Sequence, residues 1–318
     1  MRLISIVLVA NFSLLLSCSR ESGKKEEKTI TIFHAGSLSK PLKTIANSFM
    51  VENHDVKVLL EAAGSVECAR KITELGRSCD LLFSADYKVI DQLLIPNYAS
   101  WNILFAGNEM SIVYTPKSKF ANEINQQNWF EILLKPEVFF GRSDPDADPC
   151  GYRTVLTLQL AEIFYGEKDL VKRFIEKDKR FIRPKEVDLI ALLETGAIDY
   201  IFLYRSVAIQ HGLNYLQLPD SINLGKPELE SVYSTSSLKI KGSSPGDTLI
   251  VVGEPMVYGF TMPKTGTNSK LVEEFANYFI DKQKGLKMIE QSGMPVLNPL
   301  VVKNSDKLPE SIRSKVKL

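Results

Sequence analysis

The chain has 318 residues, of which 44% are hydrophobic, and its 39 basic and 38 acidic residues leave a formal net charge of +1. This is an ordinary globular composition, which excludes a disordered or fibrous chain. Without a basic stripe interleaved with aromatic residues, it also argues against nucleic acid as a partner. At roughly 100–200 residues per domain, the length predicts two lobes, each large enough to bury a core.

The N-terminus predicts export. Arg2 precedes an apolar run over residues 3–16, which is shorter than a membrane span and typical of a signal peptide, so we assign residues 1–17 to the signal. The run ends in LLSC, which resembles a bacterial lipobox, so we expect Cys18 to be lipidated and to anchor the protein to the membrane. The alternative is ordinary cleavage nearby, with Cys18 incidental. Residues 18–28 are polar and charged, which predicts a flexible tether.

The remaining cysteines are Cys68, Cys79 and Cys150. An exported protein can keep disulfides, and Cys68 and Cys79 are close enough in sequence for a bridge. The sequence does not settle whether their Cα atoms approach closely enough. No CxxC motif or Cys/His cluster with metal-ligand spacing occurs in the sequence, which argues against a structural zinc ion.

The first part of the folded body alternates strands and helices. Residues 28–33, 56–60 and 80–83 predict strands, and apolar residues at helical spacing follow the first two of them. A short helical pattern follows the third. This alternation predicts a parallel sheet with crossover helices.

A second α/β lobe is predicted next, from the strand over residues 108–115, the helix after Cys150, the helix that starts near Glu186 and the strand over residues 199–203. Residues 257–262 predict a strand that returns to the first lobe. We therefore expect residues 29–107 and 258–318 to form lobe 1 and residues 108–257 to form lobe 2. Two crossing strands would join the lobes, and the cleft between them is a natural ligand site.

Two segments of lobe 1 repeat one design, in which a strand leads into Gly-Ser and then a helix. They are FHAGSL, with Gly36 and Ser37, and EAAGSV, with Gly64 and Ser65. Helix N-termini offer unpaired N–H groups and partial positive charge, so such turns can bind an anion without Lys or Arg. Each serine could instead simply cap its own helix. The repetition favours an anion site.

The loop SDPDADPCGYRT over residues 143–154 runs into a helix, with Asp148 and Cys150 at its start. Asp148 could be only a helix cap. A secreted enzyme with Cys150 as nucleophile would need a base within reach, and the histidines lack a local catalytic signature: His34, His54 and His211. We therefore predict a binding protein without enzymatic activity or cofactor, in which the Cys150 backbone N–H contributes to the site.

Several strings together resemble the molybdate/tungstate-binding proteins of ABC transporters, in particular the tungstate-binding branch described largely from archaea. They are HAGSL, AAGSV, SADY, DPCGYR, LPDSINL and the segment over residues 183–213. The resemblance extends from about residue 29 to about residue 298. It implies a two-lobed, periplasmic-binding-protein-like (type II) fold and a monomeric extracytoplasmic protein that delivers its anion to an ABC permease.

The resemblance also implies a ligand set. Motif by motif, the ligand-binding residues would be Gly36, Ser37, Ser65, Asp148, Cys150 through its backbone, Glu186 and Tyr204 through its hydroxyl. Lobe 2 is shorter than in the archaeal members between about residues 166 and 183, next to Glu186, and the acidic residue usual in the LPDSINL string is Ser221 here. Ser221 is not counted as a ligand.

Two carboxylates beside an oxyanion should repel it. Molybdenum and tungsten, unlike sulfur, accept more than four oxygen neighbours, so Asp148 and Glu186 could ligate the metal centre itself. The resemblance implies this six-coordinate geometry, which would penalise sulfate. Arg153 and Arg205 either offset the added negative charge or form ordinary surface salt bridges.

Other interpretations stay open at this stage. The protein could bind another tetrahedral oxyanion, such as sulfate or phosphate, or be an adhesin or structural lipoprotein in which the paired Gly-Ser turns are accidental. Tungstate and molybdate share shape and charge, so the sequence predicts no preference between them.

Overall fold

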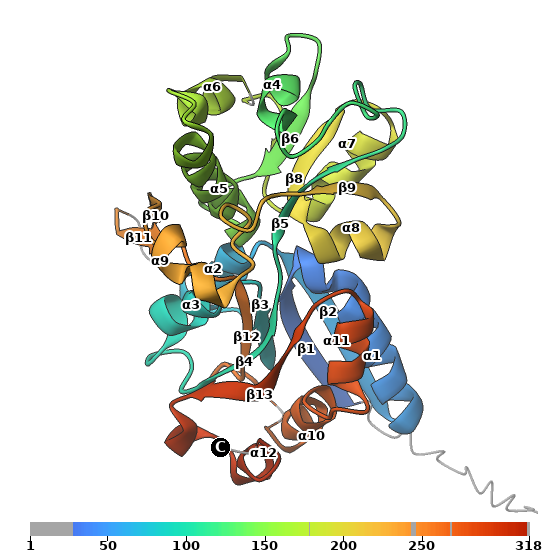
Figure 1. Ribbon diagram of the computed structural model, residues 1–318. Coiled ribbons are helices and arrows are strands. Elements are labelled where there is room, and N and C mark those ends of the chain that lie inside the picture. The colour runs from blue at the N-terminus through green and yellow to red at the C-terminus, as the bar shows by residue number, and fades with distance from the viewer. Residues whose placement is uncertain (1–27, 178, 243–245, 268, 317–318) are drawn as a thin grey trace, which may run out of the picture.

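The computed structural model describes residues 28–177, 179–242, 246–267 and 269–316 (Figure 1). The expected signal peptide, the lipidation site at Cys18 and nearly all of the expected tether lie outside the described residues. Among the residues that are described, no helix is both long and apolar enough to cross a membrane.

The sheet of lobe 1 combines strands from both ends of the chain, in the order β13-β4-β12-β3-β1-β2. Strand β1 pairs in parallel with β2 and β3, as the alternating pattern predicts, whereas β12 runs antiparallel to β3 and β4. The strands are β1 (Lys28–Ala35), β2 (Val56–Ala63), β3 (Leu81–Ser84), β4 (Asn102–Gly107), β12 (Val257–Thr261) and β13 (Val296–Lys303). The helical segments of this lobe are η1 (Gly36–Leu38), α1 (Ser39–Glu52), α2 (Ser65–Thr73), α3 (Tyr87–Val89), η2 (Ile90–Leu94), α10 (Ser269–Phe279), α11 (Gly285–Gln291), η5 (Ser305–Lys307) and α12 (Glu310–Arg313).

Lobe 2 is built on a second sheet with the order β7-β6-β8-β5-β9, and it carries a separate β10–β11 hairpin. Its strands are β5 (Met110–Tyr114), β6 (Phe140–Ser143), β7 (Ile182–Arg183), β8 (Tyr200–Tyr204), β9 (Asn214–Gln217), β10 (Ser237–Lys241) and β11 (Thr248–Val252). Its helical segments are α4 (Trp129–Leu134), α5 (Pro149–Tyr165), α6 (Leu170–Lys177), η3 (Glu186–Leu189), α7 (Ile190–Glu194), α8 (Arg205–His211), η4 (Pro227–Leu229) and α9 (Glu230–Tyr233).

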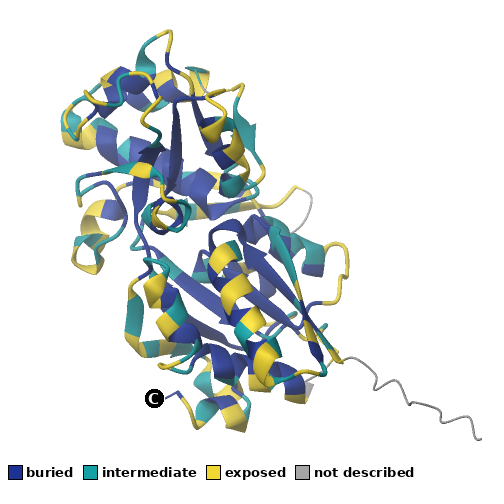
Figure 2. Ribbon diagram, turned by 90° about the vertical axis from the view of Figure 1, so that its right-hand side faces the viewer, coloured by how far each residue is buried: buried dark blue, intermediate teal, exposed yellow. Residues whose placement is uncertain are grey.

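The buried apolar side chains of the two lobes form one continuous core. The central strands are buried, whereas β9, β10, β11, β13 and the outward helix faces are partly exposed (Figure 2). In lobe 1, Phe83 of β3 stacks on Phe260 of β12 with ring centroids 5.1 Å apart, and it meets the edge of Phe279 of α10 at 4.6 Å. Such aromatic pairs stabilise a core beyond the area they bury. They explain why the C-terminal segment packs back onto the first strands.

Hydrogen bonds connect the lobes where the chain crosses between them. The Asn108 amide, between β4 and β5, donates to the Ser206 hydroxyl of lobe 2 at 2.7 Å and to the Tyr258 hydroxyl of lobe 1 at 3.1 Å. The Met256 N–H, just before β12, donates to the Leu224 carbonyl at 2.8 Å. The predicted fold of two α/β lobes joined by crossing segments is confirmed, while the lobe boundaries drawn from the sequence stay a prediction.

The disulfide that the sequence left open does not form. Cys68 and Cys79 are both free and buried. Burial raises the pKa of the Cys68 thiol to about 12. Both thiols therefore contribute to the core of lobe 1 as small apolar side chains.

Candidate anion-binding site

The two Gly-Ser turns lie at the end of lobe 1 that faces lobe 2. Neither Ser37, within η1, nor Ser65, the first residue of α2, caps its helix through its side chain. The Ser37 hydroxyl oxygen instead accepts a hydrogen bond from the Tyr258 hydroxyl at 3.0 Å, and the Ser65 oxygen accepts one from the Ala85 N–H at 2.9 Å. The simple capping role that the sequence allowed is therefore absent at both serines.

Asp148 begins helix α5 on the opposite lobe and is almost completely buried. Its Oδ1 accepts a hydrogen bond from the Cys150 N–H at 3.4 Å, as a helix N-cap does. Its Oδ2 accepts a second one from the Glu186 N–H at 3.1 Å. Asp148 thus acts as a cap and also joins the two acidic segments that the sequence singled out.

Glu186 is fully buried at the start of η3, and among the described residues neither of its carboxylate oxygens has a hydrogen-bond partner. A Cβ placed on Gly36 of lobe 1 would lie only 2.8 Å from Glu186 Oε2. Burial and the neighbouring Asp148 carboxylate raise the pKa of Glu186 well above its ordinary value. An unpaired buried carboxylate is costly, so the fold holds these two oxygens in place at a free-energy cost.

The second Gly-Ser turn also touches lobe 2. A Cβ on Gly64 would lie 2.1 Å from the carbonyl oxygen of Ala147, and the Glu67 N–H donates to the same carbonyl at 3.2 Å. Only glycine permits so close an approach between two backbones. Both turns are therefore in contact with lobe 2, and the lobes are closed on each other.

Tyr204 and Cys150 complete the predicted set. The Tyr204 hydroxyl, at the end of β8, accepts a hydrogen bond from Arg153 at 3.1 Å, and its ring lies 6.2 Å from that of Tyr258. The Cys150 thiol points at the Phe202 carbonyl, and burial, followed by the charges of the two acids, raises its pKa well above the ordinary value. Since the thiolate is the reactive form, these surroundings oppose a nucleophilic role.

The structure therefore brings all seven predicted residues to one junction between the lobes. It adds three that sequence reasoning did not select. Asp86 of lobe 1 accepts a hydrogen bond from the Tyr152 hydroxyl of lobe 2 at 2.6 Å, and Tyr258 donates to Ser37. A weak signal existed for Asp86, because the SADY string directly follows a buried strand.

The two arginines that the sequence could not place differ. Arg153 is buried and reaches Asp86 of lobe 1, with Nη2 and Oδ2 3.3 Å apart. Arg205 is partly exposed and pairs with Glu109 at 2.8 Å, which is an ordinary salt bridge. His34 is buried with its Nδ1 2.8 Å from the Ala35 carbonyl, as expected of a packed histidine.

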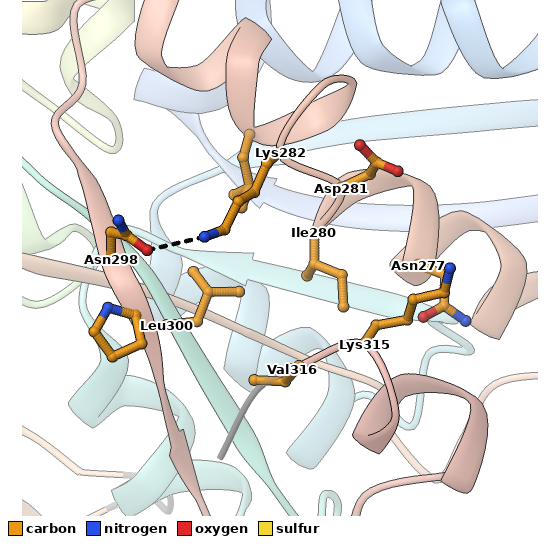
Figure 3. A pocket seen from close by; sticks show the side chains of 10 residues that line it. Asn277, Ile280, Asp281, Lys282, Asn298, Leu300, Lys315 and Val316 are labelled. Atoms are coloured by element: carbon orange, nitrogen blue, oxygen red, sulfur yellow. Dashed lines mark hydrogen bonds between the residues drawn. The ribbon is translucent and has the colours of Figure 1, made fainter.

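A cavity of about 370 Å³ lies at the other end of lobe 1 (Figure 3). It is bordered by α10, α11 and β13 and includes the hydrogen bond from Lys282 to Asn298 at 3.0 Å. None of the residues predicted from the sequence lines it. The arrangement of functional groups therefore points to the interlobe junction and not to this cavity.

Two α/β lobes closed over buried polar groups define a solute-binding protein. The chain belongs to the family of bacterial extracellular solute-binding proteins, whose model matches residues 30–295. This membership indicates an extracytoplasmic location, and the relatives are solute-binding proteins, not enzymes.

Two relatives illustrate the similarity. The chain is 45% identical to an uncharacterized solute-binding protein of Petrotoga mobilis, over 91% of this chain and 90% of that protein. It is 39% identical to the molybdate/tungstate-binding protein WtpA of Pyrococcus abyssi, over 99% of this chain and 98% of that protein.

Solved structures share the fold. The periplasmic molybdate-binding protein of Azotobacter vinelandii matches with a TM-score of 0.61 at 15% identity, over 83% of this chain and 98% of that chain. The sulfate-binding protein SubI of Mycobacterium tuberculosis matches with a TM-score of 0.61 at 13% identity, over 86% and 88%. At such identities the likeness concerns the fold alone.

Proposed function

We propose that this protein captures tungstate or molybdate between its lobes and delivers the anion to an ABC importer. The observation that carries the proposal is the pair of buried acids, Asp148 and Glu186. Within the described part of the chain, neither carboxylate oxygen of Glu186 has a hydrogen-bond partner. A site for an ordinary anion has no use for such a pair. The name of the Pyrococcus abyssi relative supports the same ligand class.

The hydrogen-bond donors and the carboxylates at the junction would bind different parts of the anion. Backbone N–H groups at helix starts suit anions, so those of Gly36, Ser37 and Ser65 would donate to oxo oxygens together with the Tyr204 hydroxyl. The Cys150 N–H, which makes a long 3.4 Å bond to Asp148 Oδ1, would add a donor once Asp148 ligates the metal centre. The two carboxylates would supply hard oxygen ligands to the metal centre. Ligation would give Glu186 the partner that it otherwise lacks.

The same geometry would exclude sulfate. Sulfur in sulfate does not accept further oxygen ligands, so both carboxylates would stay unpaired and would repel the dianion. Although this chain shares its fold with a sulfate-binding protein, we therefore do not expect it to bind sulfate.

Binding would also fix the closed arrangement. The Gly-Ser turns come from lobe 1, whereas Asp148, Glu186 and Tyr204 come from lobe 2. A ligand drives closure only by binding the closed state better, and an anion in contact with both sets does so. The closed protein, a monomer tethered to the membrane by a lipid on Cys18, would then dock on the permease.

Isothermal titration calorimetry with tungstate, molybdate, sulfate and phosphate tests the proposal. Tungstate and molybdate should bind, and sulfate should bind far more weakly. Asp148→Asn, which keeps a good helix cap, and Glu186→Gln should each weaken tungstate about 10- to 100-fold, the range expected for losing an interaction with a charged group.

Asp188→Asn is the matched control, because this acid lies in the same η3 segment and pairs with Lys185 at 3.2 Å near the surface. It should bind as the wild type does. Equal affinity for sulfate and tungstate, or unchanged selectivity in Asp148→Asn and Glu186→Gln, would reject metal ligation by the two acids.

A further inference from the structure

Arg153 makes a buried contact between the lobes near the site. Its side chain is 3% exposed and that of its partner Asp86 is 4% exposed. From α5 of lobe 2, its Nη2 lies 3.3 Å from Asp86 Oδ2 and its Nη1 donates to the Ala85 carbonyl at 2.7 Å. The neighbouring Tyr152 hydroxyl donates to the same Asp86 oxygen at 2.6 Å.

The same guanidinium also fixes the Tyr204 hydroxyl. Arg153 Nη1 lies 3.1 Å from the Tyr204 oxygen, and a guanidinium has donors only, so the tyrosine oxygen must be the acceptor. A phenol hydroxyl that accepts along one in-plane direction keeps its own proton on the other side. The contact therefore leaves the Tyr204 O–H free to donate to a second group.

We propose that Arg153 is a positioning residue for anion capture, which orients the Tyr204 hydroxyl as a donor only when the lobes are closed. Asp86 and Ala85 belong to lobe 1, so any separation of the lobes removes the two contacts that hold the guanidinium in place. Closure thereby sets the direction of a donor that lies on lobe 2. This inference rests on the proposed function, because it assigns the Tyr204 proton to the bound oxyanion.

The site's charge balance supports this assignment. A dianion beside Asp148 and Glu186 concentrates negative charge in a place that excludes water, where charges interact strongly. Arg153 is a buried cation whose bond to Tyr204 polarises the hydroxyl and makes it a stronger donor. A lysine would keep the charge but lacks the fork that reaches Asp86, Ala85 and Tyr204 at once.

A double-mutant cycle in tungstate affinity tests the proposal, using Arg153→Lys, Tyr204→Phe and the double variant of the full folded chain. Tyr204→Phe should weaken tungstate about tenfold or more. Arg153→Lys should weaken tungstate binding by a factor at least about five times larger in the protein that has Tyr204 than in the Tyr204→Phe variant, because its effect passes through the hydroxyl. If Arg153→Lys weakens tungstate binding by the same factor with and without the Tyr204 hydroxyl, the proposal is overturned.

Arg70→Lys is the matched control. Arg70 of α2 also joins the lobes, donating to the Asp146 carbonyl at 2.8 Å and to the Gly242 carbonyl at 2.9 Å. Its substitution should weaken tungstate by the same factor in both tyrosine backgrounds. Coupling of Arg70 to Tyr204 as large as that of Arg153 would reduce Arg153 to a general closure contact and overturn the positioning role.

Asp86→Asn serves as a second route if Arg153→Lys does not fold. It keeps an acceptor for Tyr152 but weakens the hold on the guanidinium, so it should couple to Tyr204→Phe with the same sign, and additivity would overturn the proposal. A wild-type chain that does not bind tungstate would reject the proposed function and this inference together. Wild-type binding with an additive cycle would reject the inference alone.

Discussion

At the scale of single residues, Glu186 is the side chain that stability alone does not explain. It is completely buried, its two oxygens lack partners among the described residues, and it lies beside a second buried acid. Selection for stability would replace such a group, because a buried carboxyl without a hydrogen-bond partner is unfavourable whether it is ionised or keeps its proton. A carboxyl group that is needed to bind a ligand would be kept at this contact between the lobes despite its cost.

The cost of Glu186 predicts a gain in stability when its charge is removed. Without ligand, Glu186→Gln should raise the free energy of unfolding by about 1 kcal/mol at pH 8, since it replaces an unpaired buried carboxylate with a neutral amide. The raised pKa means that the folded protein holds the Glu186 proton to higher pH than the unfolded chain does. The wild type therefore loses stability as pH rises above the ordinary carboxyl range.

Denaturant unfolding of both proteins at pH 5 and pH 8 measures this effect. The advantage of the glutamine variant should be larger at pH 8. An equal difference at both values of pH would show that Glu186 is not held protonated in the unliganded fold.

Ligand binding should release protons from the same pair. Burial raises the pKa of Asp148 as well as that of Glu186, so the unliganded site binds protons that metal ligation must displace. Tungstate affinity should therefore fall as pH is lowered. Calorimetry in two buffers with different ionisation enthalpies should show different apparent enthalpies, and a buffer-independent enthalpy would contradict proton release.

At the scale of elements, the site depends on two short turns approaching lobe 2 more closely than side chains allow. Gly64 has φ −61° and ψ 145°, which alanine adopts without strain. The penalty for a Cβ at this position comes from the opposite lobe, where the Ala147 carbonyl oxygen would lie 2.1 Å away and Asp148 Cβ 3.0 Å away. Glycine is therefore needed here for closure and not for the turn itself.

Gly64→Ala should separate folding from binding. The unliganded variant should be as stable as the wild type, because its lobes can remain apart, while tungstate affinity should fall at least about 100-fold. Gly107→Ala is the control, since a Cβ there meets its nearest atom at an ordinary 3.4 Å. Thermal unfolding measures the stability of both variants, and calorimetric titration measures their tungstate affinity. If Gly64→Ala binds tungstate as the wild type does, binding does not require the close contact between Gly64 and lobe 2.

The elements also show what the sequence could and could not predict. The strand–helix alternation predicted the parallel core of lobe 1, and the Asp-Pro-Cys string located the start of α5, because both signals are local. The bond from Tyr258 to Ser37 joins residues 221 positions apart, and the Asp86–Arg153 pair spans the lobes. No local periodicity specifies such contacts. The first depends on how lobe 1 brings the two ends of the chain together, and the second depends on how the two lobes close.

At the scale of the whole molecule, the two lobes have separate sheets and are joined by crossing segments and by polar contacts at the junction. The Asn108 amide contacts both lobes, and the buried acids lie where the lobes meet. A ligand that contacts both lobes therefore couples their unfolding, because each lobe loses ligand contacts when the other unfolds.

This coupling predicts a ligand-dependent melting temperature. Tungstate at 100 times its dissociation constant should stabilise the folded chain by about 2.7 kcal/mol, which at roughly 2–4 °C per kcal/mol corresponds to a rise of roughly 5–10 °C. Sulfate at the same concentration should give no rise. Tungstate at that concentration should stabilise Glu186→Gln, whose affinity is expected to be 10- to 100-fold lower, by only about 0.4–1.4 kcal/mol, a rise of roughly 1–6 °C. Differential scanning calorimetry should show a single transition for the tungstate complex. Two transitions of which tungstate shifts only one would mean that the anion contacts a single lobe, and the interlobe site would then be wrong.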